Sequence, residues 1–178
     1  MIVTMDNKET ARIFTPKIKT IILYLFLFIG IIIILREYIG GRSLWVDEAM
    51  LALNMPRSFK ELLQPLAYNQ TAPLLFLYLC KFFTILFRIS DYSLRIVPLI
   101  FGLGSYSVYF FISKKILNNF TSIIISLALY LSSYNLIYYS NEFKPYSADV
   151  FFSLLFFLFF YLVRTRGINL NKSNWVCT

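Results

Sequence analysis

Asp47 and Glu48 form an adjacent pair of carboxylates directly after the apolar residues 44–46. Two carboxylates side by side can bind a divalent cation, or one of them can stay protonated. A carboxylate within hydrogen-bond reach of a substrate can also act as a general base. A solvated or helix-capping acidic pair is the alternative interpretation. The pair is a candidate for catalysis, and Glu48 is a candidate metal ligand.

A second group of reactive side chains lies between two long apolar runs, at residues 138–146. It contains an acid, Glu142, a base, Lys144, and a tyrosine, Tyr146. Pro145 can begin the next helix, because proline is well tolerated in a first turn. Ionisable residues at the mouth of a membrane span are candidates for function. Tyrosine and lysine are also enriched at membrane interfaces, which is the alternative interpretation.

Arg95 stands at the start of another apolar run. Its planar guanidinium could hold a phosphate through two parallel hydrogen bonds. It could equally pair with Asp91 four residues earlier, or extend to lipid headgroups. These three interpretations remain open from the sequence.

The composition excludes several classes of site. The chain has no histidine, which removes Ser-His-Asp triads, Cys-His dyads and histidine-based zinc motifs. Cys80 and Cys177 lack metal-ligand spacing, so free thiols are expected. The net charge of +8 comes from Lys and Arg residues that flank apolar runs, so we expect no nucleic-acid partner.

Long apolar runs indicate an integral membrane protein. Of the 178 residues, 58% are hydrophobic and only 15% are charged, against roughly 25% charged in soluble domains. We predict an all-α, polytopic transmembrane bundle with four spans, at residues 18–35, 94–113, 120–139 and 147–163. The run after residue 35 lacks a small-residue cleavage site, so the first span is expected to be retained.

The apolar run at residues 72–88 differs from the four spans. Tyr78, Lys81, Thr84 and Arg88 share one helical face, which predicts an amphipathic helix lying in the interface. With this helix outside the membrane, the basic segments fall on one side, as the positive-inside rule requires. The segments 1–17 and 164–178 are then cytoplasmic, and the loops 36–93 and 140–146 are external. Ser58 and Glu61 fit a capping box inside the first external loop.

Four motifs in this order resemble the integral-membrane glycosyltransferases that use polyprenyl- or dolichyl-phosphate sugars. This group has the GT-C fold and includes glycosyltransferase family 39, with protein O-mannosyltransferases and lipid A aminoarabinose transferases. The motifs are the acidic pair 47–48, Gln-Thr-Ala-Pro-Leu at 70–74, Ser-Asp-Tyr-Ser-Leu-Arg at 90–95 before Pro98, and Tyr-Ser-Asn-Glu-Phe-Lys-Pro-Tyr at 139–146. The last is close to the pattern Tyr-Ser-x-Glu-x-Arg-Pro-Tyr of bacterial members. The chain looks like the N-terminal part of such an enzyme.

The resemblance implies an enzyme of the cell membrane that transfers one sugar from a lipid-phosphate donor to an acceptor hydroxyl on a glycan, lipid or protein. Asp47 would be the general base, with Glu48 and Glu142 beside it in the catalytic site. Positive charge for the departing phosphate would come from Lys144, Arg95 or a divalent metal near Glu48.

The sugar site would be shaped by Glu142 and Tyr146, with Gln70 among the substrate-binding residues. Two departures from the family pattern stand out. Gln70 and Thr71 replace an acidic and a basic residue that are common in relatives, and Lys144 replaces the usual arginine.

Two other functions remain open from the sequence. One is a transport or channel subunit, with Glu142 and Asp149 lining a path, although its acids sit at span ends instead of near mid-membrane. The other is a non-catalytic or truncated polytopic membrane protein.

Overall fold

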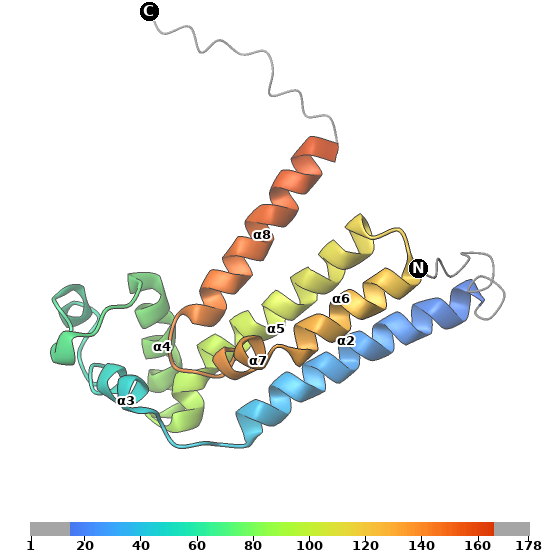
Figure 1. Cartoon of the computed structure of the whole chain (residues 1–178). Helices are drawn as coiled ribbons and strands as arrows, with labels where there is room; N and C mark the ends of the chain where they lie inside the picture. Colours follow the sequence, from blue (N-terminus) through green and yellow to red (C-terminus); the bar gives the residue numbers. More distant parts are fainter. Residues whose placement is uncertain (1–14, 166–178) are drawn as a thin grey trace, which may run out of the picture.

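The computed structural model of the chain describes residues 15–165 (Figure 1). Within this range the chain is all-helical, with seven α-helices, two short 3-10 helices and no strand. The predicted cytoplasmic segments lie largely outside it, at residues 1–14 and 166–178, as does Cys177. The α-helices are α2 (Pro16–Ile39), α3 (Val46–Ala52), α4 (Leu74–Phe87), α5 (Asp91–Ile116), α6 (Phe120–Ser132), α7 (Tyr134–Tyr139) and α8 (Tyr146–Thr165).

Three of the helices, α2, α5 and α8, are long and apolar enough to cross a membrane. Each contains one of the predicted spans, and each reaches the length of about 20 residues that a bilayer core requires. The start of α2 is fixed by Thr15, whose hydroxyl accepts a hydrogen bond from the Ile18 amide, and by Pro16 in the first turn. Large apolar side chains such as Phe156 and Phe160 on α8 are 63% and 69% exposed, as expected for surfaces that face lipid.

Helix α5 is the centre of the bundle and contacts α2, α4, α6, α7 and α8. Small residues let its neighbours approach closely, as is common between membrane helices. The side chain of Tyr106 on α5 lies directly against Gly30 on α2, where a Cβ atom would overlap its ring. The Tyr106 hydroxyl donates a hydrogen bond of 2.8 Å to the carbonyl of Phe26. This contact fixes α2 along α5.

The segment predicted as the third span differs from a single helix over 120–139. The structure divides it into α6 and α7 at Ser133, whose backbone is extended, with φ −74° and ψ 100°. Ser132, next to this break, bonds the carbonyl of Leu129 with its own hydroxyl, and serines of this kind compete with the helical hydrogen-bond ladder. Neither α6 nor α7 alone is long enough to span a membrane.

Helix α4 carries three of the four predicted stripe residues on a face that contacts protein, whereas Arg88 lies just past the helix and is exposed. The ammonium of Lys81 donates to the carbonyl of Met55 at 2.6 Å, and the Tyr78 hydroxyl donates to the carbonyl of Phe59 at 3.0 Å. Thr84 is buried, and Cys80 is a buried free thiol, as expected. The polar face of α4 therefore holds the segment after α3, and its opposite face exposes Leu, Phe and Ile side chains.

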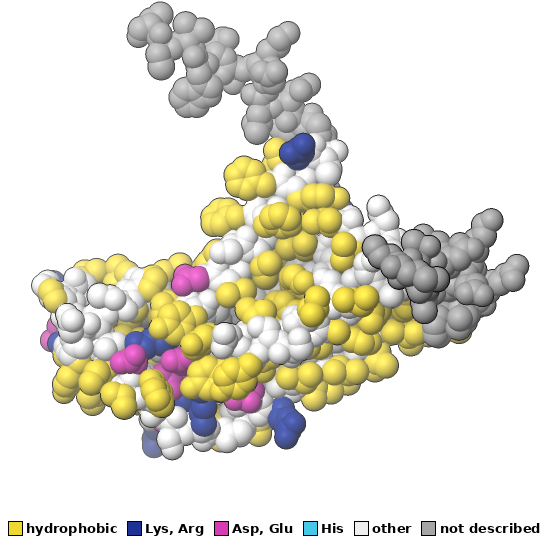
Figure 2. All heavy atoms as spheres, in the orientation of Figure 1, with side chains coloured by type: hydrophobic (Ala, Val, Ile, Leu, Met, Phe, Trp, Pro, Cys, Tyr) yellow, Lys and Arg dark blue, Asp and Glu magenta, His cyan; other side chains and the backbone are white. Residues whose placement is uncertain are grey.

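Acidic side chains gather at one end of the molecule, together with some of the basic side chains. Figure 2 shows acidic and basic side chains together at the end that carries α3 and α4, while apolar side chains cover the length of the long helices. The C-terminal end of α2 and the N-terminal ends of α5 and α8 meet at this same end (Figure 1). The loop between α7 and α8 also lies here, so the two predicted reactive segments share one region.

Candidate functional site

Glu48 is completely buried, with no exposed side-chain surface. It lies in the first turn of α3, where its Oε2 atom accepts a 2.9 Å hydrogen bond from the amide of Trp45. This bond satisfies one of the free amides at the start of the helix. The apolar neighbours on α3 face the core next to it, since Leu51 is also fully buried. Glu48 is thus part of the interior, unlike the adjacent Asp47, which is exposed.

Arg95 on α5 binds Glu48 through one edge of its planar guanidinium, formed by Nε and Nη2. Its Nε atom donates to Oε1 of Glu48 at 3.2 Å, and its Nη2 atom donates to Oε2 at 2.9 Å. Arg95 is only 3% exposed. Its remaining donors bond the carbonyls of Arg42 at 2.6 Å and Ser43 at 3.3 Å. The structure therefore pairs Arg95 with Glu48, a partner that none of the three interpretations from the sequence named.

The loop between α7 and α8 joins this ion pair. The amide of Phe143 donates a 2.6 Å hydrogen bond to Oε1 of Glu48, and the Phe143 side chain is fully buried. Asn141 fixes the same loop to α2, since its amide nitrogen donates to the carbonyl of Ile34 at 3.2 Å. Glu48 therefore connects α3, α5 and the loop at 140–145. Segments that are 95 residues apart meet at this one carboxylate.

Two opposing effects act on the ionisation of Glu48. Burial alone would raise its pKa, because removal from water penalises the charged form. Hydrogen bonds from Arg95 and from the amides of Phe143 and Trp45 stabilise the carboxylate, and the net pKa is lowered. Glu48 is an anion at neutral pH.

Glu142 lies in the same loop and is 5% exposed, but it has no comparable partner. Its Oε2 atom is buried and makes no hydrogen bond with any described residue. Burial, followed by the negative charge of Glu48, raises the pKa of Glu142 above its usual range. The cations Arg42, Lys144 and Arg95 oppose this rise in part. Two neighbouring carboxyl groups therefore differ in pKa, which is the arrangement by which active sites separate acid and base roles.

Lys144 is almost buried at 7% exposure, and its ammonium donates a 2.8 Å hydrogen bond to the side-chain oxygen of Gln70. The two residues line an open groove of about 520 Å³ between the segment before α4 and the start of α8. Asn69, Thr71, Ala72, Pro73, Pro145, Tyr146 and Asp149 complete its walls. Lys144 is the positively charged residue among those that line the groove. A smaller apolar groove of about 130 Å³ adjoins it and shares Pro73, Pro145 and Asp149.

Asp47 is exposed and forms no ion pair or hydrogen bond with the described residues 15–165. The neighbouring Glu48 bonds the amide of Phe143, which brings Asp47 to the same end of the bundle as the loop that contains Tyr146. The ring of Tyr146 packs edge-on against Tyr139, with centroids 5.0 Å apart. The free carboxylate of the acidic pair therefore lies at the same end of the bundle as the groove that contains Lys144.

A metal site at Glu48 does not fit the residues present. Each carboxylate oxygen of Glu48 already accepts two hydrogen bonds from Arg95 and backbone amides. In residues 15–165 no three acidic or cysteine side chains gather closely enough to hold an ion. Gln70, which lines the groove, accepts a hydrogen bond from Lys144. The positive charge at the groove is supplied by an ammonium.

Two residues of the site were not expected from the sequence. Arg42 stacks its guanidinium on the ring of Tyr138, 3.7 Å from the centroid, and Asn141 ties the loop to α2. Both depend on contacts between segments roughly a hundred residues apart, for which spacing along the chain gives no signal. Only the turn at Gly40 and Gly41, where Gly41 has φ +57°, marks the segment that carries Arg42.

Compared with protein-family models, with curated proteins and with solved structures, the chain matches none.

Proposed function

We propose that the chain is part of a multi-pass membrane glycosyltransferase of the GT-C type, with its active loops on the external side. It would transfer a sugar from a polyprenyl-phosphate donor to an acceptor hydroxyl. The observation that carries this proposal is the convergence of the acidic pair and the 140–146 loop at one end of the bundle. There the exposed Asp47 directly precedes Glu48, which bonds the loop that carries Lys144 and Tyr146, two residues that line the polar groove.

The chemistry needs a base and a cation on either side of the sugar. Asp47 would accept the proton of the acceptor hydroxyl as its oxygen bonds to the anomeric carbon. The bond from that carbon to the phosphate oxygen breaks, and the polyprenyl phosphate leaves as an anion. Lys144 would stabilise the charge on this anion, because preorganised positive charge acts strongly in a partly dry site. Gln70 would have to release the ammonium when the phosphate binds.

The apolar groove that adjoins the polar one supports the proposal of a lipid donor. Leu75, Phe76, Leu79, Phe101 and Phe152 give it an apolar lining beside Pro145. A phosphate at Lys144 could thus continue into an apolar chain between α4 and α8, both of which pack on α5. Four membrane crossings, with α6 and α7 together forming the third, complete the proposed topology.

The experiment measures sugar transfer by the full chain after its reconstitution in lipid vesicles. Polyprenyl-phosphate sugars and nucleotide sugars, each labelled in the sugar, are supplied in turn with membrane glycolipids and proteins as acceptors. The proposal expects label to reach an acceptor from the polyprenyl-phosphate donors alone. Transfer from a nucleotide sugar alone, or none from either donor by folded protein, would contradict it. Ion-dependent uptake by the same vesicles would instead favour a transport subunit.

A further inference from the structure

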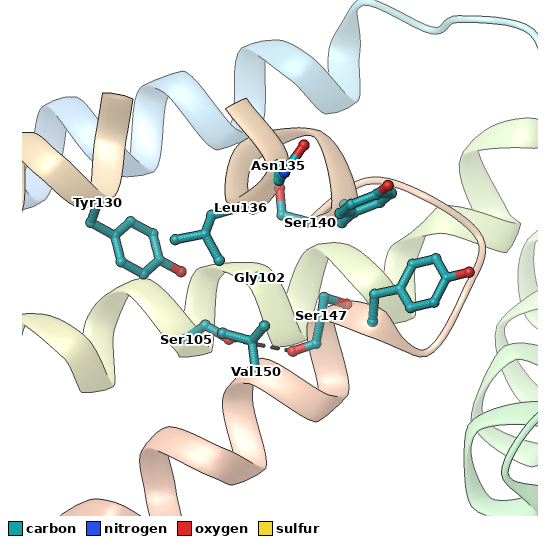
Figure 3. A pocket seen from close by; sticks show the side chains of 10 residues that line it. Gly102, Ser105, Tyr130, Asn135, Leu136, Ser140, Ser147 and Val150 are labelled. Carbon is teal, nitrogen blue, oxygen red and sulfur yellow. Dashed lines mark hydrogen bonds between the residues drawn. The ribbon is translucent and has the colours of Figure 1, made fainter. Parts of the chain in front are cut away.

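We propose that a small cavity at the break between α6 and α7 is a binding site for ordered water. The cavity has a volume of about 70 Å³ and lies between α5, the α6–α7 break and the start of α8 (Figure 3). Its lining includes Gly102 and Ser105 from α5, Asn135 and Leu136 from α7, and Ser147 from α8. It is separate from the groove that contains Lys144. This inference does not depend on sugar transfer.

The hydroxyl of Ser147 is the first observation that indicates a ligand. Ser147 is 4% exposed, lines the cavity, and its Oγ atom is buried without a hydrogen-bond partner in the described chain. Its backbone carbonyl is already used, since it accepts a 3.4 Å hydrogen bond from Ser105 (Figure 3). A buried hydroxyl that is left unpaired is costly, so native proteins satisfy such groups with protein or with water.

The break at Ser133 is the second observation. Helix α7 begins with amides that have no partner inside the helix, and its N-cap Ser133 makes no side-chain hydrogen bond to them. Within a membrane protein, broken helices occur where they line a cavity or are buried in protein. Asn135 and Leu136, in this first turn, are part of the lining. The break between α6 and α7 therefore borders the same cavity as the free hydroxyl of Ser147.

The size of the cavity selects water as the occupant. A water molecule requires roughly 10–15 Å³ of such volume and two to four polar partners. The cavity provides room for a few molecules, and Figure 3 shows Tyr130 pointing from α6 toward the same space. An apolar occupant would leave Ser147 unsatisfied. Water in the cavity would satisfy the hydroxyl of Ser147 and fill the space beside the break between α6 and α7.

Hydroxyl-radical footprinting with X-rays tests this proposal, because water bound next to a buried side chain generates radicals in place. The experiment uses the full chain in nanodiscs. Tyr130 is 7% exposed and lines the cavity, whereas Tyr106 is fully buried on the neighbouring helix and does not. We expect oxidation of Tyr130 and none of Tyr106. Protection of both tyrosines alike would overturn the proposal.

A matched pair of variants distinguishes two causes of Tyr130 oxidation, namely water in the cavity and exposure of Tyr130 to bulk solvent. Ser147→Ala removes the free hydroxyl and should cause a loss of Tyr130 oxidation. Ser107→Ala removes a hydroxyl of α5 that already bonds the carbonyl of Leu103 at 2.8 Å and that does not line the cavity. It should leave Tyr130 oxidation unchanged. Oxidation that persists in Ser147→Ala would show that bulk solvent is the source, and the proposal would fail.

Discussion

The carboxylate of Glu48 and the guanidinium of Arg95 form a buried, two-pronged ion pair, with N–O distances of 2.9 and 3.2 Å. The pair connects the first loop to α5, and the amide of Phe143 adds the loop before α8. Because all three segments depend on one carboxylate, the pair holds the surface on which Asp47 and Lys144 lie. The ion pair positions the first loop, which carries α3, against the loop before α8.

Glu48→Ala should destabilise the protein by about 3–5 kcal/mol, because it leaves the charge of Arg95 buried and unpaired. The combined change to Glu48→Leu and Arg95→Leu removes both charges, so it should recover part of this loss. Thermal unfolding of purified protein in detergent measures both. Asp47→Ala, at the exposed neighbour, is the control and should change stability by less than about 0.5 kcal/mol. Equal losses at positions 47 and 48 would show that the ion pair is not a major support.

Glu142 should make stability fall as the pH rises. Its pKa is raised from the ordinary value of 4.5 by burial and by Glu48, so the folded state binds its proton more tightly than the unfolded state does. The contribution of Glu142 to stability is then fully present below pH 4.5 and is lost as the pH rises through the folded pKa. Glu142→Gln lacks this titration, so its melting temperature should exceed that of the wild type increasingly above pH 4.5. Parallel pH profiles of the two proteins would contradict the assignment.

The lowered pKa of Glu48 acts in the opposite direction and in a different range. Its stabilising contribution is present above the unfolded value of 4.5 and is lost as the pH falls through the folded pKa. Both proteins in the Glu142 comparison carry this group. The difference between their profiles above pH 4.5 therefore reports Glu142 alone.

Gly30→Val should separate α2 from α5. A side chain at this position overlaps the ring of Tyr106, and crowding of this kind typically costs about 1–3 kcal/mol. Gly40→Ala is the control, because a Cβ there meets only backbone oxygens at 3.4 Å. Thermal unfolding and proteolysis of the reconstituted chain compare the two variants. A tolerated valine at position 30 would mean that the two helices do not pack as described.

The sequence predicted the long helices and the amphipathic character of α4 because these depend on local periodicity. The capping box at Ser58 was also confirmed, since its amide donates to Glu61 at 2.7 Å, although only a 3-10 turn, Glu61–Leu63, follows. The break at Ser133 was missed, because the run from 120 to 139 is uniformly uncharged and two serines are compatible with a span.

The sequence named several residues of this cluster, but not the contacts between them. The sequence singled out Glu48, Arg95 and Lys144, but it could not pair Glu48 with Arg95, since the pairing depends on how α3 packs against α5. It also treated Asp47 and Glu48 as a unit. Adjacent residues on a helix point about 100° apart, so one of them is buried and the other is exposed.

Lys144→Gln should weaken binding of a polyprenyl phosphate while the fold remains intact. The ammonium bonds only Gln70 among the described residues, and glutamine can keep a hydrogen bond there without the positive charge. Loss of a charge-assisted bond of this kind costs roughly 1.5–3 kcal/mol, or about tenfold or more in affinity. Binding to vesicles containing a fluorescent polyprenyl phosphate measures the effect. Lys81→Gln, at a lysine that bonds the carbonyl of Met55 away from the groove, is the matched control.

The central claim is that Asp47 is the base of a sugar-transfer site, and its most direct test is transfer by Asp47→Asn at saturating polyprenyl-phosphate donor. The substitution keeps the size of the side chain and removes the proton acceptor, so the rate should fall by about 10²–10⁴-fold with donor affinity unchanged. Glu37→Gln, at an exposed carboxylate on α2, should keep the wild-type rate. Transfer by Asp47→Asn at the wild-type rate would contradict the claim.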